Sequence, residues 1–497
     1  MDSENKMITT VGMSLAVILV SFIFYFLTWL LKKINVWLYE DTLPEEIRQR
    51  LPPGDLGWPL IGNMWPFLRA FKSTYPDAFT DSYISRFGNR GVYKCFMFGS
   101  PSILVTSPDA NKRVLNDDQA FKPGWPVATE NLMGKKSFTS IPYEEHKRLR
   151  KLTAAPVNGH EALSQYIPYI EENVKTALEE WSQMGKIEVL TELRKLTFKI
   201  IMFIFLGGEG ENIMKGLENE YTVLNYGLRA LAIDIPGFAY HKAFKARKKL
   251  VAIFQAVVDE RRAKRRNGVT VKKDMMEYLL DIKDENGKGL TDEDVIDILL
   301  MYLNAGHESS GHITMWAADL LQAHPDIFQK AKEEQERIVK ERPPNQNELT
   351  LREIRKMEYL SMVVDETLRI VTFSPFVFRE ALQDFKIGDY IIPKGWKVVT
   401  WFRTVHYDPE VYPNPLQFNP DRWRGFVPKA GSFLPFSAGS RLCPGNDLAK
   451  LEISIFLHHF LLGYKLEREN PKCPLMHLPH TRPCDNCYGK IRSLGLM

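Results

Sequence analysis

A cysteine in a short segment with glycines and prolines is the first candidate for chemistry. The segment FLPFSAGSRLCPG ends at Gly445 and contains the pattern F-x-x-G-x-R-x-C-x-G around Cys443. A chain could place a cysteine there as a buried core thiol, as half of a disulfide, or as a thiolate ligand to a metal or haem iron. The pattern also contains Phe436, Gly439 and Arg441.

The number of cysteines bears on these three interpretations. Five cysteines in 497 residues are an odd and sparse set, unlike a disulfide framework: Cys95, Cys443, Cys473, Cys484 and Cys487. The last two form a lone CxxC with no second pair at zinc spacing, so we interpret it as coincidence rather than as a zinc site. The chain also lacks an N-x-S/T glycosylation sequon. Both observations fit a reducing, cytosolic environment for most of the chain.

A second group of polar residues, AGHESS, follows an apolar run. The preceding ILLMYLNA is apolar nearly all round, which indicates burial. The group could be a polar patch on a solvated face, but a buried acid beside hydroxyls, as Glu308 beside Ser309, is more often functional. A glycine inside a helix, as predicted for Gly306, makes the helix about 1 kcal/mol less stable than alanine would.

The helix that carries AGHESS is predicted to be long. Thr291 and Asp294 predict a capping box, and the 3.6-residue pattern continues to about Ala323, before His324-Pro325 ends it. A helix of roughly 33 residues spans about 50 Å, enough to cross a whole domain.

Two further motifs contain charged residues that could pair. ETLR places Glu366 and Arg369 at i, i+3 on one helix face, and FNPDRW supplies Arg422. A surface ion pair would explain ETLR taken alone.

The remaining pattern predicts a mainly α body with small β-sheets. VYKCFMF and SILVTS, on either side of Gly99-Ser100-Pro101, predict a hairpin, and Asp384–Phe402 predicts further short strands. With 44% hydrophobic and 25% charged residues the composition is ordinary for a folded chain. The net charge of +4 and the motifs give no indication of a nucleic-acid partner.

The N-terminal region predicts a membrane anchor. No residue is charged in Ile8–Leu31, and 24 residues of helix span roughly 36 Å, more than the about 30 Å of a hydrocarbon core. A cleaved signal peptide is the alternative, but Asp2 and Glu4 stand where a basic region is expected. Lys32 and Lys33 follow the run, which predicts that the body stays in the cytosol.

We therefore expect an anchor and polar linker over residues 1–50 and a catalytic domain over residues 51–497. Leu51–Asn63 (LPPGDLGWPLIGN) contains prolines and glycines that cannot continue a helix, and its position after the span predicts a hinge.

Taken together and in this order, the cysteine loop, AGHESS, ETLR and FNPDRW resemble the cytochrome P-450 family of haem-thiolate monooxygenases. The resemblance covers the whole chain and implies the cytochrome P-450 fold with haem b as cofactor. It implies that Cys443 is the axial iron ligand, whose thiolate favours O–O cleavage. Gly439 and Gly445 would let the loop backbone approach the sulfur.

The resemblance also implies roles for other residues. Arg441 and Arg379, and Arg150 in EEHKRLRKL, would bind the haem propionates. Glu308 and Ser309 resemble the acid–alcohol pair that delivers protons to bound dioxygen, with serine where threonine is usual. Beside the haem, Gly306 would open the helix locally for dioxygen, next to Ala305. Glu366, Arg369 and Arg422 would form a structural triad.

The basic run around Arg150 has more than one interpretation. His146 stands where the family more often has tryptophan, and it could bind a propionate or face solvent. Lys147, Arg148 and Lys151 could dock an acidic electron donor or form an ordinary charged helix face.

Within the family, segments such as FKPGWPVATENLMGKKSF and LMYLNAGHESSGH resemble the plant ent-kaurenoic acid oxidases of gibberellin biosynthesis. That resemblance implies successive oxidations and a ring contraction of a diterpenoid acid; oxidation of a β-amyrin-type triterpene is the alternative. For a carboxylate substrate, Lys122, Arg229 and His480 are candidate anchors by location, and a solvated or haem-side role is the alternative for each. The candidate pocket residues are Lys122, Trp125, Leu303, Phe373, Phe376 and His480.

A haem-thiolate isomerase or dehydratase, and a haem carrier or sensor, are the other classes considered; the retained acid–alcohol pair argues against both. The expected partners are NADPH–cytochrome P-450 reductase, dioxygen, a terpenoid and membrane lipid. The expected location is the endoplasmic reticulum membrane, with a single span and a cytosolic catalytic domain, or the outer plastid envelope.

Overall fold

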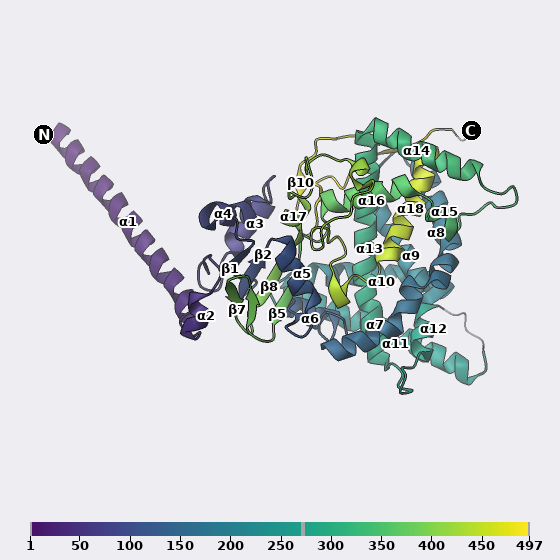
Figure 1. The fold of residues 1–497 in the computed structure, drawn as a ribbon, viewed down its shortest axis with the longest axis horizontal. Coiled ribbons are helices and arrows are strands. Elements are labelled where there is room, and N and C mark those ends of the chain that lie inside the picture. Colours follow the sequence, from purple (N-terminus) through teal and green to yellow (C-terminus); the bar gives the residue numbers. More distant parts are fainter. Residues whose placement is uncertain (1, 270–273, 496–497) are drawn as a thin grey trace.

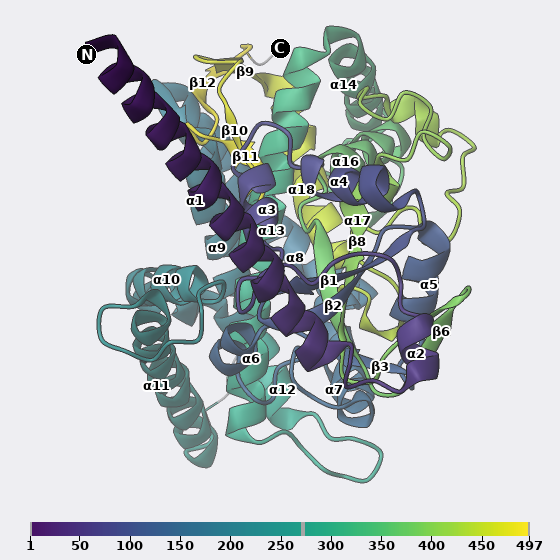
Figure 2. The same cartoon turned by 90° about the vertical axis from the view of Figure 1, so that its left-hand side faces the viewer.

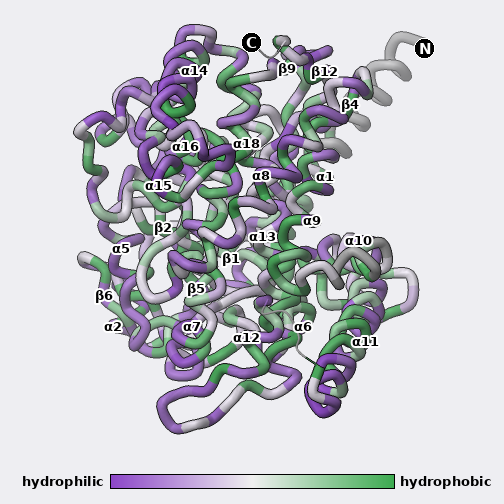
Figure 3. The backbone as a smooth tube through the Cα atoms, turned by 90° about the vertical axis from the view of Figure 1, so that its right-hand side faces the viewer, coloured by the Kyte–Doolittle hydropathy of each residue, from purple (hydrophilic) through white to green (hydrophobic). Residues whose placement is uncertain are grey.

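Long helices form most of the body, and a small β-rich region lies between them and the N-terminal helix (Figure 1). The computed structural model describes residues 2–269 and 274–495, without the side chains of residues 2–14, 16, 17, 209–212 and 215. This arrangement confirms the predicted mainly α fold with small sheets. In Figures 2 and 3 the sheet of β9 and β12 lies at the opposite end of the body from α11 and α12.

The described helices are α1 (Asp2–Tyr39), α2 (Glu45–Gln49), α3 (Met64–Phe71), α4 (Ala78–Phe87), α5 (Pro108–Asn116), α6 (Val127–Met133), α7 (Tyr143–Asn158), α8 (His160–Gln183), α9 (Val189–Leu206), α10 (Gly210–Gly227), α11 (Ala239–Arg266), α12 (Met275–Asp281), α13 (Asp292–Ala323), α14 (Pro325–Lys340), α15 (Leu351–Ile354), α16 (Glu358–Val371), α17 (Phe402–His406) and α18 (Asn446–Gly463). Short 3-10 turns are η1 (Gly207–Glu209), η2 (Pro420–Trp423) and η3 (Gly439–Arg441).

The strands are β1 (Val92–Met97), β2 (Ser100–Val105), β3 (Phe121–Pro123), β4 (Lys186–Glu188), β5 (Phe376–Ala381), β6 (Phe385–Ile387), β7 (Tyr390–Ile392), β8 (Lys397–Trp401), β9 (Tyr464–Arg468), β10 (Leu475–Met476), β11 (Arg482–Pro483) and β12 (Tyr488–Ser493). They form a five-stranded sheet in the order β1-β2-β8-β5-β3, a three-stranded sheet β4-β12-β9, and the pairs β10-β11 and β6-β7.

The central helix α13 agrees with the sequence prediction at both ends. The Thr291 hydroxyl accepts a hydrogen bond from the N–H of Asp294 (3.2 Å), and the Asp294 carboxylate accepts one from the N–H of Thr291 (2.9 Å). This pair is the predicted capping box, and α13 ends at Ala323, as expected. The helix packs against α9, α16 and α18. Figure 3 shows hydrophobic residues concentrated along α9 and more hydrophilic ones on the peripheral α14.

The predicted hairpin is also confirmed. Antiparallel pairing of β1 with β2 runs from Val92 with Val105 to Met97 with Ser100. Gly99 supplies the positive φ (+78°) that the tight turn requires. The second strand starts at Ser100, so the turn is shorter than the three residues expected. The predicted strands in Asp384–Phe402 are β6, β7 and β8, and β8 pairs in parallel with β2.

The anchor helix α1 continues past the expected span and reaches the body. Within the described residues one segment, Ile18–Tyr39, is long and apolar enough to cross a membrane; side chains in the first part of the expected span, Ile8–Leu31, lie outside the description. At its far end Asn35 is buried, and its amide donates to the carbonyls of Leu56 (2.9 Å) and Trp58 (3.0 Å).

The Pro/Gly-rich segment Leu51–Asn63 packs onto the body. The N–H of Phe96 donates to the Asn63 side chain (2.8 Å), and the N–H of Asn63 donates to the carbonyl of Phe96 (2.8 Å). Leu56 is buried in the sheet-side core. The segment is therefore held against β1, while its predicted role as a hinge concerns motion and stays a prediction.

Candidate functional site

The Cys443 loop is closed by its own backbone. The N–H of Cys443 donates to the carbonyl of Phe436 (2.9 Å), and α18 begins three residues after the cysteine. Burial raises the pKa of the Cys443 thiol, whereas the backbone N–H of Gly445 and the charge of Arg150 act in the opposite direction. Cys443 is free rather than disulfide-bonded. The loop therefore holds a thiol close to donors that favour the thiolate.

We expected the two loop glycines to let the backbone approach the sulfur. Their surroundings differ from each other, and neither supports that reason. Gly439 has φ +75°, and a Cβ there would lie 2.1 Å from the carbonyl oxygen of Leu115 in α5. Contact with α5 therefore requires a glycine at this position, and approach of the backbone to the sulfur does not. A Cβ at Gly445 would meet no protein atom within 4 Å, so protein packing does not explain that glycine.

Positive charge is concentrated beside the loop. Arg379 is buried on β5, and its guanidinium donates a hydrogen bond to the carbonyl of Phe378 (3.0 Å). Burial and nearby Arg441 lower the pKa of Arg379 to about 10. Asp118 is 3.8 Å from Arg441, and the Nε atom of Arg441 is buried without a hydrogen-bond partner. Among the described residues, no carboxylate lies within 4.0 Å of Arg379, so this buried guanidinium has no paired anion, and Asp118 is the carboxylate near Arg441.

His146 lies in the same positive region and is buried, so the solvated interpretation of this residue is wrong. Burial and the charges of Arg441, Arg150 and Arg379 lower its pKa to about 3. Its Nδ1 atom has no hydrogen-bond partner. A buried neutral imidazole and three guanidiniums together form a pocket in which an anionic group would be stabilised.

Arg441 also connects the cysteine loop to the central helix. Its guanidinium donates to the carbonyl of Phe138 (3.0 Å), and the Phe138 ring lies 6.0 Å from the ring of Tyr302 on α13. Tyr302 donates to the hydroxyl of Thr153 on α7 (3.0 Å). The loop, α7 and α13 therefore meet around one region.

One face of α13 is accessible in the middle of an otherwise buried helix. Ala305 is exposed and Ser309, one turn later, is half-buried, whereas Leu303 and His307 are buried. The Ser309 hydroxyl donates to the carbonyl of Ala305 (2.9 Å). Exposure in a central helix indicates that this face borders an internal space.

Gly306 does not interrupt α13, which is helical throughout. The expected local opening of the helix is therefore not observed. A Cβ at Gly306 would lie 3.0 Å from the Cδ1 atom of Ile201 on α9. Close packing of α13 against α9 explains this glycine better.

Glu308 turns toward α9 and not toward Ser309. Its carboxylate forms an ion pair with Arg194, a residue that sequence reasoning missed because nothing in TELRKL distinguishes it from a surface arginine. His480 lies 3.8 Å from the same carboxylate. Despite burial, Arg194 and the neighbouring histidines lower the pKa of Glu308 to about 2. Among the described contacts, none joins the side chains of Glu308 and Ser309.

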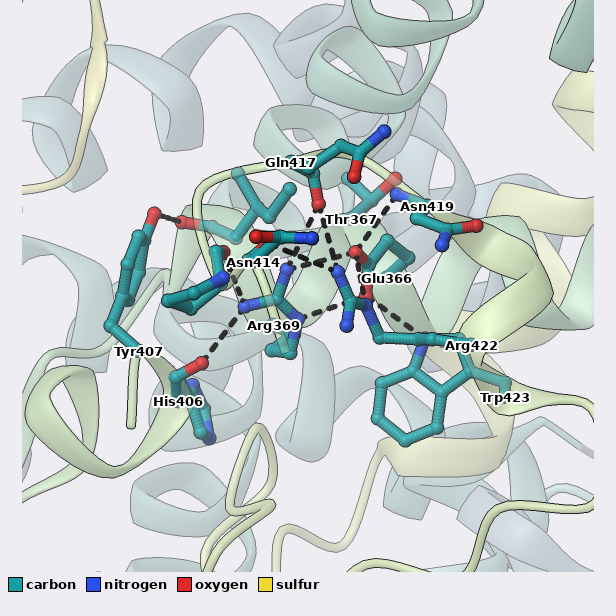
Figure 4. Close-up of polar contacts among 12 residues, drawn as sticks. Glu366, Thr367, Arg369, His406, Tyr407, Asn414, Gln417, Asn419, Arg422 and Trp423 are labelled. Carbon is teal, nitrogen blue, oxygen red and sulfur yellow. Dashed lines mark hydrogen bonds and ion pairs between the residues drawn. The ribbon is translucent and has the colours of Figure 1, made fainter. Parts of the chain in front are cut away.

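The three residues expected as a structural triad are brought together in the interior (Figure 4). Glu366 and Arg369 are fully buried, and the Glu366 carboxylate accepts hydrogen bonds from Arg369 (2.8 Å) and Arg422 (2.8 Å). The indole of Trp423 donates to the same carboxylate (3.0 Å). The surface-pair interpretation of ETLR is therefore wrong.

His406 joins this triad to the cysteine loop. Arg369 donates to the carbonyl of His406 (2.9 Å), and the His406 Nε2 atom accepts from the N–H of Leu434, in the segment leading to Cys443 (2.8 Å). Burial and two nearby arginines lower the pKa of His406 to about 3. No sequence motif marks this residue.

The structure separates the candidate pocket residues. Leu303 is fully buried in the core, and its role in the pocket stays a prediction. Lys122 is exposed and pairs with Glu380 (2.8 Å). Trp125 and Phe376 are half-buried and pack within the sheet-side aromatic cluster, where Phe376 stacks on Trp401 at 4.9 Å.

Phe373 and His480 do lie together. Their rings stack with centroids 3.8 Å apart, and His480 Nδ1 lies 3.1 Å from the carbonyl of Phe373. Arg229 approaches His480 from the end of α10, with Nη2 2.8 Å from Nε2.

The remaining candidate surfaces are less distinctive. In the basic run, Arg148 pairs with Glu145 and Asp284, and Lys151 pairs with Glu285, so much of the positive charge of this run is locally compensated.

Within the described residues, no group of three or more His, Cys, Asp or Glu side chains is arranged to hold a metal ion, and this includes the CxxC cysteines.

The family model for cytochrome P-450 matches residues 52–483. The chain is 65% identical over 467 residues to ent-kaurenoic acid oxidase 1 of Arabidopsis thaliana, covering 94% of this chain and 95% of the relative. It is 58% identical to ent-kaurenoic acid oxidase 1 of Hordeum vulgare (93% and 94% covered) and 50% identical to a 7,8-epoxymelianol synthase of Ailanthus altissima (93% and 94% covered).

Among solved structures, the retinoic acid-bound cyanobacterial CYP120A1 superposes with a TM-score of 0.80 at 28% identity, covering 90% of this chain and 99% of that one. The chain therefore belongs to the cytochrome P-450 family, and it is a cytochrome P-450 monooxygenase with haem as cofactor.

The residues present fit the haem group. The unpaired buried guanidinium of Arg379, with Arg441 and His146 beside it, suits two propionates. A Cβ at Gly445 would meet no protein atom within 4 Å, and Ala305 is exposed on α13, so both positions leave room for the group. Bound haem with a thiolate ligand supplies activation of dioxygen for insertion of one oxygen atom into a substrate.

Proposed function

We propose that this enzyme is an ent-kaurenoic acid oxidase that converts ent-kaurenoic acid, by successive oxidations and a ring contraction, into the first gibberellin skeleton, gibberellin A12. The observation that carries the proposal is the 65% identity over 94% of the chain to an enzyme of that name. Several relatives that are named ent-kaurenoic acid oxidase are 56% or more identical to this chain, whereas a 7,8-epoxymelianol synthase is 50% identical.

The roles of this chain's residues follow from their positions. Cys443 would hold the iron through its sulfur, with the Gly445 N–H and Arg150 favouring the thiolate. Arg379, Arg441 and Arg150 would hold the propionates. Ser309, on the accessible face of α13, would present its hydroxyl to the reacting space.

Because Glu308 pairs with Arg194, a proton that passes from Glu308 to the Ser309 hydroxyl needs a change of the Glu308 rotamer or an intervening water. The proposed acid–alcohol relay is therefore supported by proximity along the helix and not by a direct bond.

The proposed electron donor is NADPH–cytochrome P-450 reductase, and the proposed location is the endoplasmic reticulum membrane. The apolar α1 supports membrane attachment, and Lys32 and Lys33 at its body-side end support a cytosolic catalytic domain. The outer plastid envelope is the alternative location.

The test is microsomal expression with a reductase, feeding ent-kaurenoic acid and β-amyrin in parallel and identifying products by mass spectrometry. We expect NADPH-dependent conversion of ent-kaurenoic acid. Product from the triterpene alone would contradict the proposal, and turnover without NADPH and reductase would point to an isomerase or dehydratase.

The control for the chemistry is Cys443→Ala. We expect loss of the ferrous–CO Soret band that is characteristic of thiolate ligation, because no other thiolate is offered by the loop. Cys473→Ala, a half-buried cysteine outside the loop, is the matched control and should keep the band. Retention of the band in Cys443→Ala would exclude this cysteine as the ligand.

A further inference from the structure

A carboxylate substrate must find a cation or N–H donors in an otherwise apolar pocket, because an unpaired buried carboxylate is strongly disfavoured. We propose that Arg229, oriented by His480, binds the carboxylate of the substrate. This inference rests on the proposed function, which names an acid as substrate, and it adds the residues that recognise the acid group.

His480 fixes the direction of the Arg229 guanidinium. The stack on Phe373 (3.8 Å between centroids, 12° between planes) holds the imidazole plane. The Phe373 carbonyl can only accept, so the nearby Nδ1 of His480 (3.1 Å) must carry the proton. Nε2 then has a lone pair that accepts from Arg229 Nη2 at 2.8 Å.

Most donors of the guanidinium remain available to a ligand. An arginine has five N–H donors, and Arg229 uses one on His480 and one in a long contact with Asn225 (3.4 Å). Among the described residues, no carboxylate lies within salt-bridge distance of Arg229. A free guanidinium edge of this kind matches the two oxygens of a carboxylate.

The local charge balance favours an added anion. Glu308 is the carboxylate of this cluster, and it is already paired with Arg194. Burial and the charge of Arg229 hold the pKa of His480 near 3, so His480 is neutral at physiological pH. Two guanidiniums and one carboxylate leave one positive charge, which a substrate carboxylate would neutralise.

Arg229 is accessible to a ligand and yet partly desolvated. Its side chain is exposed, while burial among protein atoms lowers the pKa of its guanidinium. A charged hydrogen bond to this guanidinium would therefore be screened less than one on the open surface. His480 lies 3.8 Å from the Glu308 carboxylate, so the anchor lies beside the middle of α13.

Lys122, the other candidate anchor, is excluded by its surroundings. It is exposed on β3 and pairs with Glu380, which is also 2.6 Å from Lys397. It therefore serves as the matched control for loss of a basic side chain.

The test compares ent-kaurenoic acid with its neutral methyl ester on the full-length microsomal enzyme, using the substrate-induced haem spectral shift to measure Kd. For Arg229→Gln we expect a Kd for the acid that is about 10- to 100-fold higher, as for loss of a charged hydrogen-bond pair, and a Kd for the ester changed by less than about threefold. Arg229→Lys should fall between wild type and Arg229→Gln, and Lys122→Gln should match wild type.

His480→Phe is a second variant that keeps the stack on Phe373 and the charge of Arg229 but removes the Nε2 acceptor. We expect a smaller, acid-selective loss of affinity. The ferrous–CO spectrum of each variant reports whether it is folded with haem bound.

The outcomes separate the two proposals. Wild-type enzyme that binds neither acid nor ester overturns both the proposed function and this inference. Wild-type enzyme that converts the acid, while Arg229→Gln binds acid and ester with wild-type affinity or loses both equally, overturns only the role of Arg229.

Discussion

At the scale of single residues, Glu452 on α18 is a buried acid with no basic side chain within salt-bridge distance among the described residues. It is buried in the core, and neither of its carboxyl oxygens has a hydrogen-bond partner. Burial raises its pKa to about 8, and Ser310 on α13 opposes that rise. The carboxyl is therefore protonated in the folded protein at neutral pH.

This residue gives the stability a predictable pH dependence. An unfolded glutamate titrates at its ordinary value, 4.5, so between pH 5 and 8 the folded state binds a proton that the unfolded state does not. The free energy of unfolding should therefore fall as pH rises through this window. We expect Glu452→Gln to remove this component, so that its Tm falls less than that of wild type between pH 5.5 and 8.5.

Thermal unfolding at both pH values measures the effect. Glu469→Gln, at an exposed position, should keep the wild-type slope. Identical slopes for wild type and Glu452→Gln would show that Glu452 is ionised in the folded protein.

At the scale of elements, the triad and His406 attach three separate segments to one another. Glu366 and Arg369 belong to α16, Arg422 to η2, and His406 ends α17 and accepts from Leu434 of the cysteine loop. The triad alone ties α16 to η2, and His406 extends this connection to the loop that would hold the haem iron.

We expect His406→Phe to lower haem content while leaving most helices folded. The change removes the acceptor for Leu434 and the partner of Thr372, and each unsatisfied buried group costs about 1–3 kcal/mol. The ratio of Soret to protein absorbance should fall, with nearly unchanged far-UV circular dichroism. His160→Phe, at an exposed position at the start of α8, should match wild type. Full haem content in His406→Phe would mean that the loop holds its geometry without this residue.

At the scale of the whole molecule, the anchor helix and the body share a boundary inside α1. Asn35 is buried with its amide on the carbonyls of Leu56 and Trp58, and Glu40 pairs with Lys94 of β1 at 2.6 Å. The buried polar contacts between α1 and the body therefore begin at Asn35, within the stretch expected to be anchor and linker, while the ring of Phe24 on the exposed part of α1 lies 6.5 Å from the ring of Trp58.

Two truncations test this boundary. Removal of residues 1–31 keeps Asn35 and Glu40, and we expect its Tm to stay close to that of the full chain. Removal of residues 1–40 deletes a buried amide with two hydrogen bonds and a half-buried ion pair, and we expect Tm to fall by about 2–5 °C. Equal Tm values for both truncated proteins would show that α1 adds nothing to the stability of the body.

Patterns carried by adjacent residues were predictable from the sequence. The capping box of α13, the β1–β2 hairpin and the loop around Cys443 depend on residues a few positions apart, whose geometry the local backbone determines. Glu366 and Arg369 belong to the same class, since one helical turn brings them together.

Features that depend on how elements meet were not predictable. Leu303 and Ala305 stand two residues apart on α13, and only the orientation of the helix decides that Leu303 faces the core and Ala305 the open side. Likewise, contact with α5 explains the glycine at position 439, and contact with Ile201 explains Gly306.

The sequence by itself determined the class of chemistry. The thiolate loop, AGHESS, ETLR and FNPDRW are each a short contiguous stretch, and their order along the chain is visible in the sequence. Only the tertiary structure decided which charges face one another. Arg194 pairs with Glu308 across 114 positions, and Arg229 meets His480 across 251. Electrostatic partners and substrate anchors act over a few ångströms of space, and packing of distant elements, rather than their separation in the chain, sets those distances.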